Sequence, residues 1–171
     1  FDDLKNIIQI LLNNSKYKIV FRPYPGNKKA DKVLEIKNQF LNNKNFVFDL
    51  SDNYFDIYAN SVCLITDISG TAFTFAYATG KPVIFFSKME KSLNSLGFSK
   101  LEYFKDRKKI GVIAETPNEI LSFIKNLAEI KKKIIITNKN LLEQIHYLGK
   151  SKQRIKGIVD KIVTKNYKNI N

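Results

Sequence analysis

Residues 62–86 read VCLITDISGTAFTFAYATGKPVIFF, and this stretch predicts a strand, a polar turn, a helix and a second strand. The apolar run at 62–66 is rich in β-branched residues, which is typical of a buried parallel strand. We expect the following helix to end at Gly80, which suits the left-handed C′ position, because Pro82 prevents its continuation. Residues 83–86 form the next strand, so the stretch predicts one unit of a parallel α/β sheet.

The turn between this strand and this helix predicts an anion site. Ser69 is a good N-cap, Gly70 lets a ligand approach the backbone, and Thr71 adds a hydroxyl at the first helical position. A helix N-terminus after a strand has unpaired N–H donors and a partial positive charge, which suit a diphosphate. Asp67 is expected either to orient the turn by accepting N–H bonds or to contact a ligand hydroxyl. The alternative is that Ser69 serves only as a cap.

The same alternation of strand and helix extends on both sides of this unit. Hydrophobic spacing predicts further helices at residues 3–13, 33–41, 55–59, 116–130, 141–147 and 151–165, and further strands at residues 17–21, 46–48 and 110–114. Residues 87–109 are polar and irregular, with some helical turns. This order predicts a doubly wound α/β fold, with about five parallel strands and helices on both faces, similar to a Rossmann half.

The length and composition suit one intracellular domain. A chain of 171 residues fits a single core, and the sole cysteine, Cys63, lies inside an apolar strand, which indicates a packed thiol and no disulfide framework. No apolar run reaches the roughly 18 residues needed to cross a bilayer. The chain starts at Phe1 with a helical pattern already under way, so we expect a C-terminal fragment of a longer, two-domain protein.

The C-terminal part of the chain is strongly basic. The whole chain has a net charge of +13, and residues 121–171 hold twelve Lys or Arg against three acidic residues. Within it, residues 150–171 predict a basic amphipathic helix with apolar residues at helical spacing. A solvated outer helix and attraction to anionic lipid or to a lipid-phosphate acceptor both fit this pattern. Nucleic acid is not expected, because no nucleic-acid motif accompanies the charge.

His146 is the only histidine, and we expect it on the surface of a late helix near Glu143 and Lys150. With no second histidine, neither a Ser-His-Asp triad nor a histidine-based metal site is expected. Metal-ligand spacing is also missing from the sequence, so the sequence predicts no metal.

In doubly wound sheets, ligands bind beyond the carboxyl ends of the strands. The predicted strand ends carry polar, turn-rich loops at 22–27, 49–53 and 67–71. Arg22 is able to bind a phosphate with two hydrogen bonds or to remain a solvated loop residue. Tyr24 is able to bond a phosphate, to stack on a base or to pack as a loop aromatic.

Four segments in these loops share an order with a known family: RPYP at 22–25, DLSDNY at 49–54, ITDISG at 65–70 and GKPVIF at 80–85. Weaker matches are LGF at 96–98, Gly111 before a Thr-x-x-Glu helix start, and GKS at 149–151. Together they resemble the CDP-glycerol glycerophosphotransferase family of teichoic acid and capsule synthesis, over roughly residues 17–163. The likeness is to the C-terminal, donor-binding half of its two-domain GT-B architecture.

The resemblance implies one nucleotide-donor-binding domain over residues 1–171. It implies a transferase that moves glycerol phosphate, a related polyol phosphate or a sugar from a CDP-activated donor to a cell-surface polymer or lipid-linked acceptor. It also implies a cytoplasmic protein, peripheral on the inner face of the membrane and inactive without its N-terminal domain. The donor is a substrate, so no cofactor is expected. Two alternatives stay open: a glycosyltransferase or epimerase-like domain using a UDP- or GDP-sugar, and a non-catalytic scaffold or membrane-docking domain.

The residues that the resemblance assigns to the donor are Arg22, Tyr24, Ser51, Asp67, Ser69, Gly70 and Thr71. The chain departs from the family at several positions. Tyr24 stands where the family has a histidine assigned to phosphate contact or acid/base work, and a phenol of pKa about 10 is a poor general base at neutral pH. Gly70 replaces a second serine, Leu96 replaces a frequent arginine, and Ser87 with Lys88 replaces a usual aspartate. The catalytic residue is therefore unassigned, with Tyr24 as the one candidate.

Overall fold

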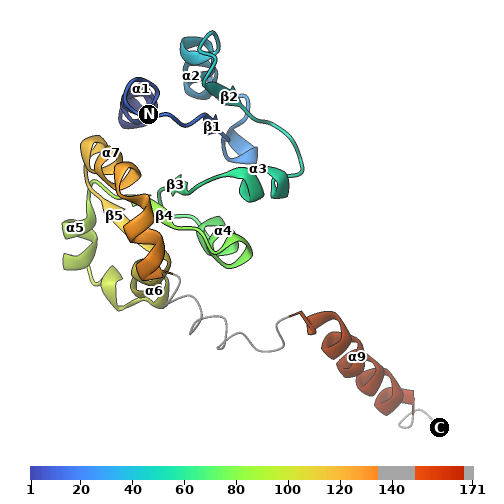
Figure 1. Cartoon of the computed structure of the whole chain (residues 1–171). Helices are drawn as coiled ribbons and strands as arrows, with labels where there is room; N and C mark the ends of the chain where they lie inside the picture. The colour runs from blue at the N-terminus through green and yellow to red at the C-terminus, as the bar shows by residue number, and fades with distance from the viewer. Residues whose placement is uncertain (135–148, 168–171) are drawn as a thin grey trace.

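A computed structural model describes residues 1–134 and 149–167 of the chain. The predicted helix at 141–147, with His146, lies outside the described residues. The elements that carry the fold are α1 (Asp2–Asn14), β1 (Ile19–Phe21), η1 (Pro25–Asn27), α2 (Asp31–Phe40), β2 (Phe46–Phe48), α3 (Phe55–Asn60), β3 (Leu64–Thr66), α4 (Thr71–Thr79), β4 (Val83–Phe86), α5 (Glu90–Ser95), η2 (Phe98–Lys100), α6 (Glu102–Ile110), β5 (Gly111–Ala114), α7 (Pro117–Lys125) and α9 (Ser151–Tyr167) (Figure 1).

The strands pair in parallel throughout the described residues, which confirms the predicted fold class. They form two hydrogen-bonded ladders, β1–β2 and β3–β4–β5, rather than one continuous ladder. Ile19 lies opposite Phe46 in the first ladder. In the second, Ile84 lies opposite both Ile65 and Val112.

Helices cover the strands from both faces. On one face, Ile7 and Leu11 of α1 pack with Ile84 of β4 and Ile120 of α7. On the same side, Ile8 of α1 belongs to the cluster that joins α2 to β1 and β2. The opposite face of β3 and β4 is covered by α3 and α4, through a cluster of Tyr58, Ala72, Phe75, Ala76, Val83, Phe85 and Ile110. The sheet is therefore doubly wound.

Local signals fix several boundaries. Gly80 has φ 64° and ends α4 in the left-handed region, as predicted. Thr116 and Glu119 form a reciprocal capping box at the start of α7, with Pro117 at the first helical position. Gly111 is needed for a different reason: a Cβ there would lie 2.0 Å from the Val83 carbonyl oxygen on the paired strand. Only glycine permits this close approach of β5 to β4.

The structure corrects the sequence prediction in two segments. Residues 87–109 are more regular than expected, since they form α5, η2 and α6. The helix predicted at 116–130 is interrupted at Asn126, and residues 127–134 continue as a separate helical stretch. In residues 87–109 the polar pattern hid the helix ends, whereas at Asn126 the apolar spacing continued across the break.

Two ionisable side chains of the α5–α6 segment are buried. Arg107 is 1% exposed, and its Nη2 donates to both carboxylate oxygens of Glu90 at 2.9 Å. The guanidinium lies over the Phe104 ring, 4.4 Å from its centroid, and near the Phe85 ring. This ion pair and its aromatic contacts tie α5 and α6 to the end of β4.

The α9 helix carries an apolar stripe without burying it. The side chains of Ile155, Ile158, Val159, Ile162 and Val163 are 47–61% exposed. Figure 1 shows α9 apart from the other labelled elements. Within residues 1–134 and 149–167, no helix is both long enough and apolar enough to cross a membrane.

Candidate functional site

The positions of α2 and α4 indicate where the strand order reverses. The α2 helix follows β1 and packs on one face of the sheet, whereas α4 follows β3 and packs on the other. Since parallel crossovers are right-handed, these two connections must run in opposite directions along the sheet. In agreement, Ile19 of β1 packs in the same cluster as Ile65 of β3. Ligands bind beyond the carboxyl ends of strands at such a reversal, so the loops after β1 and β3 flank the candidate site.

Arg22, at the end of β1, ties together two of these loops. Its guanidinium donates to the Asp49 carboxylate, to the Ser51 main-chain oxygen at 2.6 Å and to Ser51 Oγ at 3.2 Å. It also lies 5.8 Å from the centroid of the Tyr54 ring. Arg22 is thus neither a free phosphate ligand nor a solvated loop residue here. It is a cross-link between the ends of β1 and β2 at the rim of the site.

This cross-link sets the charge of Asp49. Burial acts to raise its pKa, but hydrogen bonds from the Ser51 hydroxyl and main-chain N–H, with the Arg22 guanidinium, hold the pKa below its usual value. Asp49 therefore stays ionised, and Arg22 and Asp49 neutralise each other. Ser51 was predicted to contact the nucleotide donor. In this structure it is instead a hydrogen-bond partner of the Arg22 and Asp49 side chains.

Tyr24 is one of the exposed residues among those predicted for the site. It is 74% exposed and directly precedes η1, the short helical turn after β1. Its ring lies over Gly26, where a Cβ would meet ring carbon Cε1 at 3.0 Å. The position gives the phenol free access to a ligand above the β1 loop, but no neighbouring base activates it in the described residues.

The β3–α4 turn has the predicted position at the start of a helix. Thr71 is the first residue of α4 and Gly70 occupies the cap position, one residue later than predicted for Ser69. The Ser69 hydroxyl still accepts from the Thr71 N–H, at 3.4 Å. The Thr71 hydroxyl contacts the Tyr58 hydroxyl at 2.5 Å, which turns it toward α3. Ser69 and Gly70 are therefore the residues of this turn best placed for an anion.

Asp67 does not orient the turn as one interpretation expected. Its carboxylate is exposed and accepts no hydrogen bond from the described residues. The orienting contact comes instead from Tyr103 of α6, whose hydroxyl accepts from the Ser69 N–H at 2.7 Å and donates to the Ser69 carbonyl at 3.1 Å. No pattern in the sequence pointed to Tyr103, because it lies 34 residues from Ser69, in the segment predicted to be irregular.

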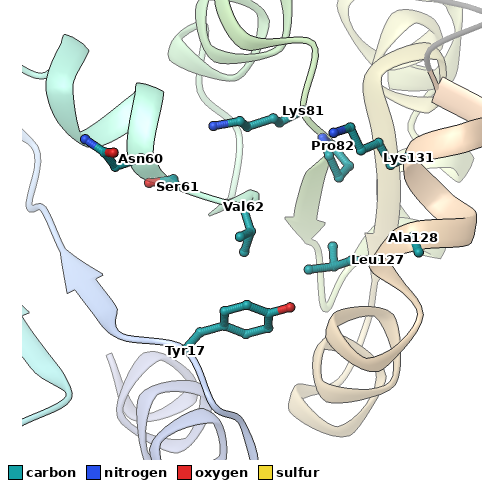
Figure 2. A pocket seen from close by; sticks show the side chains of 9 residues that line it. All are labelled: Tyr17, Asn60, Ser61, Val62, Lys81, Pro82, Leu127, Ala128 and Lys131. Atoms are coloured by element: carbon teal, nitrogen blue, oxygen red, sulfur yellow. The ribbon is translucent and has the colours of Figure 1, made fainter.

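A pocket of about 310 Å³ lies at the opposite end of the strands (Figure 2). Its lining includes Val62 just before β3, Pro82 just before β4 and Tyr17 before β1. Lys81, also at its edge, donates to the main-chain oxygen of Ala59 at 2.5 Å and so ties α3 to the start of β4. The amino ends of the strands are remote from the predicted loops, so this pocket is not the donor site.

The described residues offer no metal centre. Within residues 1–134 and 149–167, His, Cys, Asp and Glu side chains form no group of three that could hold a metal ion. Cys63 packs beside Ile65 against α1 and α7, and burial raises the pKa of its thiol to about 12. It is an inert core residue. What the loops offer chemically is a helix N-terminus, a fixed arginine and an open carboxylate.

Comparisons with known proteins bear on the family and on the fold. Residues 3–163 match the family model described as CDP-glycerol:poly(glycerophosphate) glycerophosphotransferase. A solved structure of the wall teichoic acid polymerase TagF is similar, with a TM-score of 0.61 and 20% identity over 96% of this chain and 39% of that one. A second similar structure is a histidine-to-asparagine variant of TagF, soaked with CDPG for 30 minutes. Its TM-score is 0.56 at 20% identity, over 97% of this chain and 48% of that one.

The two kinds of match carry different weight. The structural likeness, at this identity, shows the fold, and this chain spans less than half of each of those structures. No curated protein sequence matches significantly. The family model covers nearly the whole chain.

Proposed function

Since this chain belongs to the CDP-glycerol:poly(glycerophosphate) glycerophosphotransferase family, we propose that it is the donor-binding part of a transferase. It would bind CDP-glycerol, and the glycerol phosphate would pass to a cell-surface polymer or lipid-linked acceptor. The observation that carries the proposal is the β3–α4 turn: a helix N-terminus with an open glycine at the point where the strand order reverses. Such a turn favours a diphosphate through its N–H donors and partial positive charge.

The surrounding residues suggest distinct roles. The Ser69 hydroxyl and the main chain at Gly70 would contact the diphosphate. Arg22 would keep the neighbouring loop in place. The Asp67 carboxylate suits a hydroxyl of the ribose or of glycerol, because it repels phosphate and accepts hydrogen bonds. Tyr24 would contact the donor from the β1 loop.

The chain by itself is expected to bind the donor without turning it over. Among the assigned residues, the candidate for acid/base work is the Tyr24 phenol, and a phenol is a poor base. We propose that the remaining part of the protein supplies the acceptor surface and the base.

Titration calorimetry with CDP, CDP-glycerol, CMP, UDP and GDP tests the proposal. We expect CDP and CDP-glycerol to bind more tightly than CMP, since the β-phosphate adds charge at the helix N-terminus. Tighter binding of UDP or GDP would instead favour a nucleotide-sugar donor. If none of the five ligands binds at millimolar concentration, the donor-binding proposal is wrong.

A double variant locates the ligand. Ser69→Ala with Thr71→Ala is expected to weaken CDP binding by about 1–3 kcal/mol, the range for losing hydrogen bonds to a charged group. Thr74→Ala is the matched control, because Thr74 is exposed on the next turn of the same helix. An unchanged dissociation constant in the double variant would place the ligand elsewhere.

We also propose that α9 lies on an anionic membrane surface. Its apolar stripe is exposed, and at helical spacing Lys152 and Lys156 flank the stripe on one side and Arg154 and Lys161 on the other. Apolar residues bordered by basic ones are typical of helices that lie in the lipid interface. A donor-binding domain held there would be close to a lipid-linked acceptor.

Flotation with liposomes tests this role of α9. The chain is expected to float with vesicles containing anionic lipid, to float less at high salt, and to stay at the bottom with neutral vesicles. A chain lacking residues 150–171 should lose the binding to anionic vesicles. Equal flotation of the two chains would exclude α9 as the contact.

A further inference from the structure

The Tyr103 hydroxyl holds both main-chain groups of one residue in the β3–α4 turn. It accepts from the Ser69 N–H at 2.7 Å and donates to the Ser69 carbonyl at 3.1 Å. One hydroxyl thus satisfies the donor and contacts the acceptor of the same residue. Ser69 is fixed relative to α6 although 34 residues separate the two in sequence.

The ring that carries this hydroxyl is held by its neighbours. It packs edge-on against Phe73 of α4 and against Phe104, with ring centroids 5.4 Å apart in each pair. Phe104 in turn lies under the Arg107 guanidinium, whose partner Glu90 is buried. Burial also raises the pKa of Tyr103, so the phenol stays protonated and able to donate at neutral pH. The hydroxyl is therefore placed by the packing of α6, not by the flexible turn.

Most N–H groups at the start of α4 already have acceptors. The Ser69 N–H bonds Tyr103 and the Thr71 N–H bonds Ser69 Oγ. The N–H groups of Ala72 and Phe73 bond the carbonyls of Ser69 and Gly70, both at 3.2 Å. Among the N–H groups of residues 69–73, the one without an acceptor in the described residues is that of Gly70. Gly70 is exposed, and an added Cβ would meet nothing within 4 Å, so a ligand has room to approach.

We propose that Tyr103 is a positioning residue for the donor's diphosphate: by holding the Ser69 main chain, it leaves the Gly70 N–H as the main-chain donor offered to a phosphate oxygen. The inference rests on the proposed function, because it assumes a diphosphate at this turn. It adds that the Ser69 N–H does not contact the phosphate. It also adds that a side chain of α6, outside the three predicted loops, sets the affinity of the site.

The first test measures CDP binding to the full 171-residue chain by calorimetry. Tyr103→Phe keeps the ring and removes the hydroxyl, and it is expected to weaken CDP binding by roughly three- to tenfold, the weight of one neutral hydrogen bond. Tyr77→Phe is the matched control. Its ring also contacts Phe73, but its hydroxyl bonds no group of the turn in the described residues. Equal or tighter binding by the Tyr103 variant would overturn the inference.

The second test uses the unsubstituted chain and so does not depend on how the variant folds. In amide NMR spectra, CDP is expected to shift the Gly70 resonance, while the Ser69 amide stays protected from hydrogen exchange with and without ligand. A Ser69 amide that exchanges freely, or a CDP-induced shift at Ser69 without one at Gly70, would contradict the inference. In Tyr103→Phe, exchange at Ser69 should become faster.

A third variant removes the proposed donor itself. Gly70→Pro lacks the N–H, and the φ of −63° at this position is one that proline adopts. It should weaken CDP binding by about ten- to a hundredfold, as expected for a lost hydrogen bond to a charged group. Binding at the original affinity would overturn the role of Gly70. Failure of the unsubstituted chain to bind CDP would instead contradict the proposed function, and with it this role of Tyr103.

Discussion

Asp49 shows how single residues hold the candidate site in shape. Its carboxylate accepts from the Arg22 guanidinium and from the Ser51 N–H, so it links the loop after β1 to the loop after β2. The side chain is only 13% exposed, and that of Arg22 is 24% exposed. At this degree of burial an ion pair with several hydrogen bonds contributes more than a surface pair does.

Asp49→Asn is expected to lower the free energy of unfolding by about 1–2 kcal/mol at neutral pH, since a charged hydrogen-bond acceptor is lost. The pKa of Asp49 is lowered in the folded protein. Its contribution is therefore fully present above the unfolded pKa of about 4 and is lost as the pH falls through the lower folded value.

Urea unfolding at neutral pH and at pH values below the folded-state pKa of Asp49 tests this dependence on pH. The difference between the variant and the unsubstituted chain should shrink as the pH falls below about 4. Asp52→Asn is the control, because the Asp52 side chain in the same loop is fully exposed. The same loss of stability for Asp49→Asn in acid and at neutral pH would contradict the assignment.

Gly70 shows that a difference from the family need not impair the turn. Its φ of −63° and ψ of −25° are ordinary helical values, so the backbone there does not require glycine. The space around its missing Cβ is open. Relative to serine, the site loses a hydroxyl but keeps the main-chain N–H, which is the group that an anion at a helix N-terminus uses.

At the scale of elements, α5 and α6 are the part of the fold that supports the β3–α4 turn. The Glu90–Arg107 pair joins them inside the core, and Arg107 Nε and Nη1 have no partner among the described residues. A buried pair of this kind adds little net stability when complete, but breaking it leaves a charge without compensation. The effect of the Glu90–Arg107 pair on the free energy of unfolding is thus visible mainly in variants that replace one of the two partners.

Glu90→Gln should lower the free energy of unfolding by about 3 kcal/mol or more, because the Arg107 charge is then buried without a counter-ion. Replacing both partners, with Glu90→Leu and Arg107→Met, should recover most of that loss. Glu102→Gln is the control, since its pair with Lys105 is exposed and worth at most about 1 kcal/mol. The measurement is denaturant unfolding at neutral pH, and equal effects of Glu90→Gln and Glu102→Gln would show that the buried pair is unimportant.

Elements with strong local signals were predictable from the sequence. The α7 start carries Thr116, Pro117 and Glu119 in consecutive capping roles, and α4 ends at the predicted glycine. By contrast, α6 has no cap side chain and a strongly polar composition, so its pattern did not stand out from a loop. Its apolar contacts, through Phe104 and Ile110, are made by tertiary packing.

At the scale of the whole molecule, α9 is separate from the core. Each of its side chains up to residue 164 is exposed, so its removal takes away no buried apolar area. A chain lacking residues 150–171 should therefore unfold at the same temperature as the full chain in calorimetry. A clear drop in the unfolding temperature would show that α9 packs on the domain in solution, against its proposed role at a membrane.

The order of the strands is also a property of the whole molecule. Hydrophobic runs predicted that the strands are parallel, because strands buried on both faces read as continuous apolar segments. They did not predict which strands are neighbours. The reversal between β1 and β3 became clear only when α2 and α4 were seen on opposite faces.

The sequence by itself determined the fold class, the position of the β3–α4 turn and the family, because these depend on periodicity and on residue types at short spacing. Only the tertiary structure decided that Arg22 bonds Ser51, that Glu90 pairs with Arg107, and that Tyr103 holds Ser69. Each of these contacts joins residues 17–34 positions apart. Local patterns encode which face of a helix or strand is apolar, but side-chain partners at such separations are set by how the elements pack together.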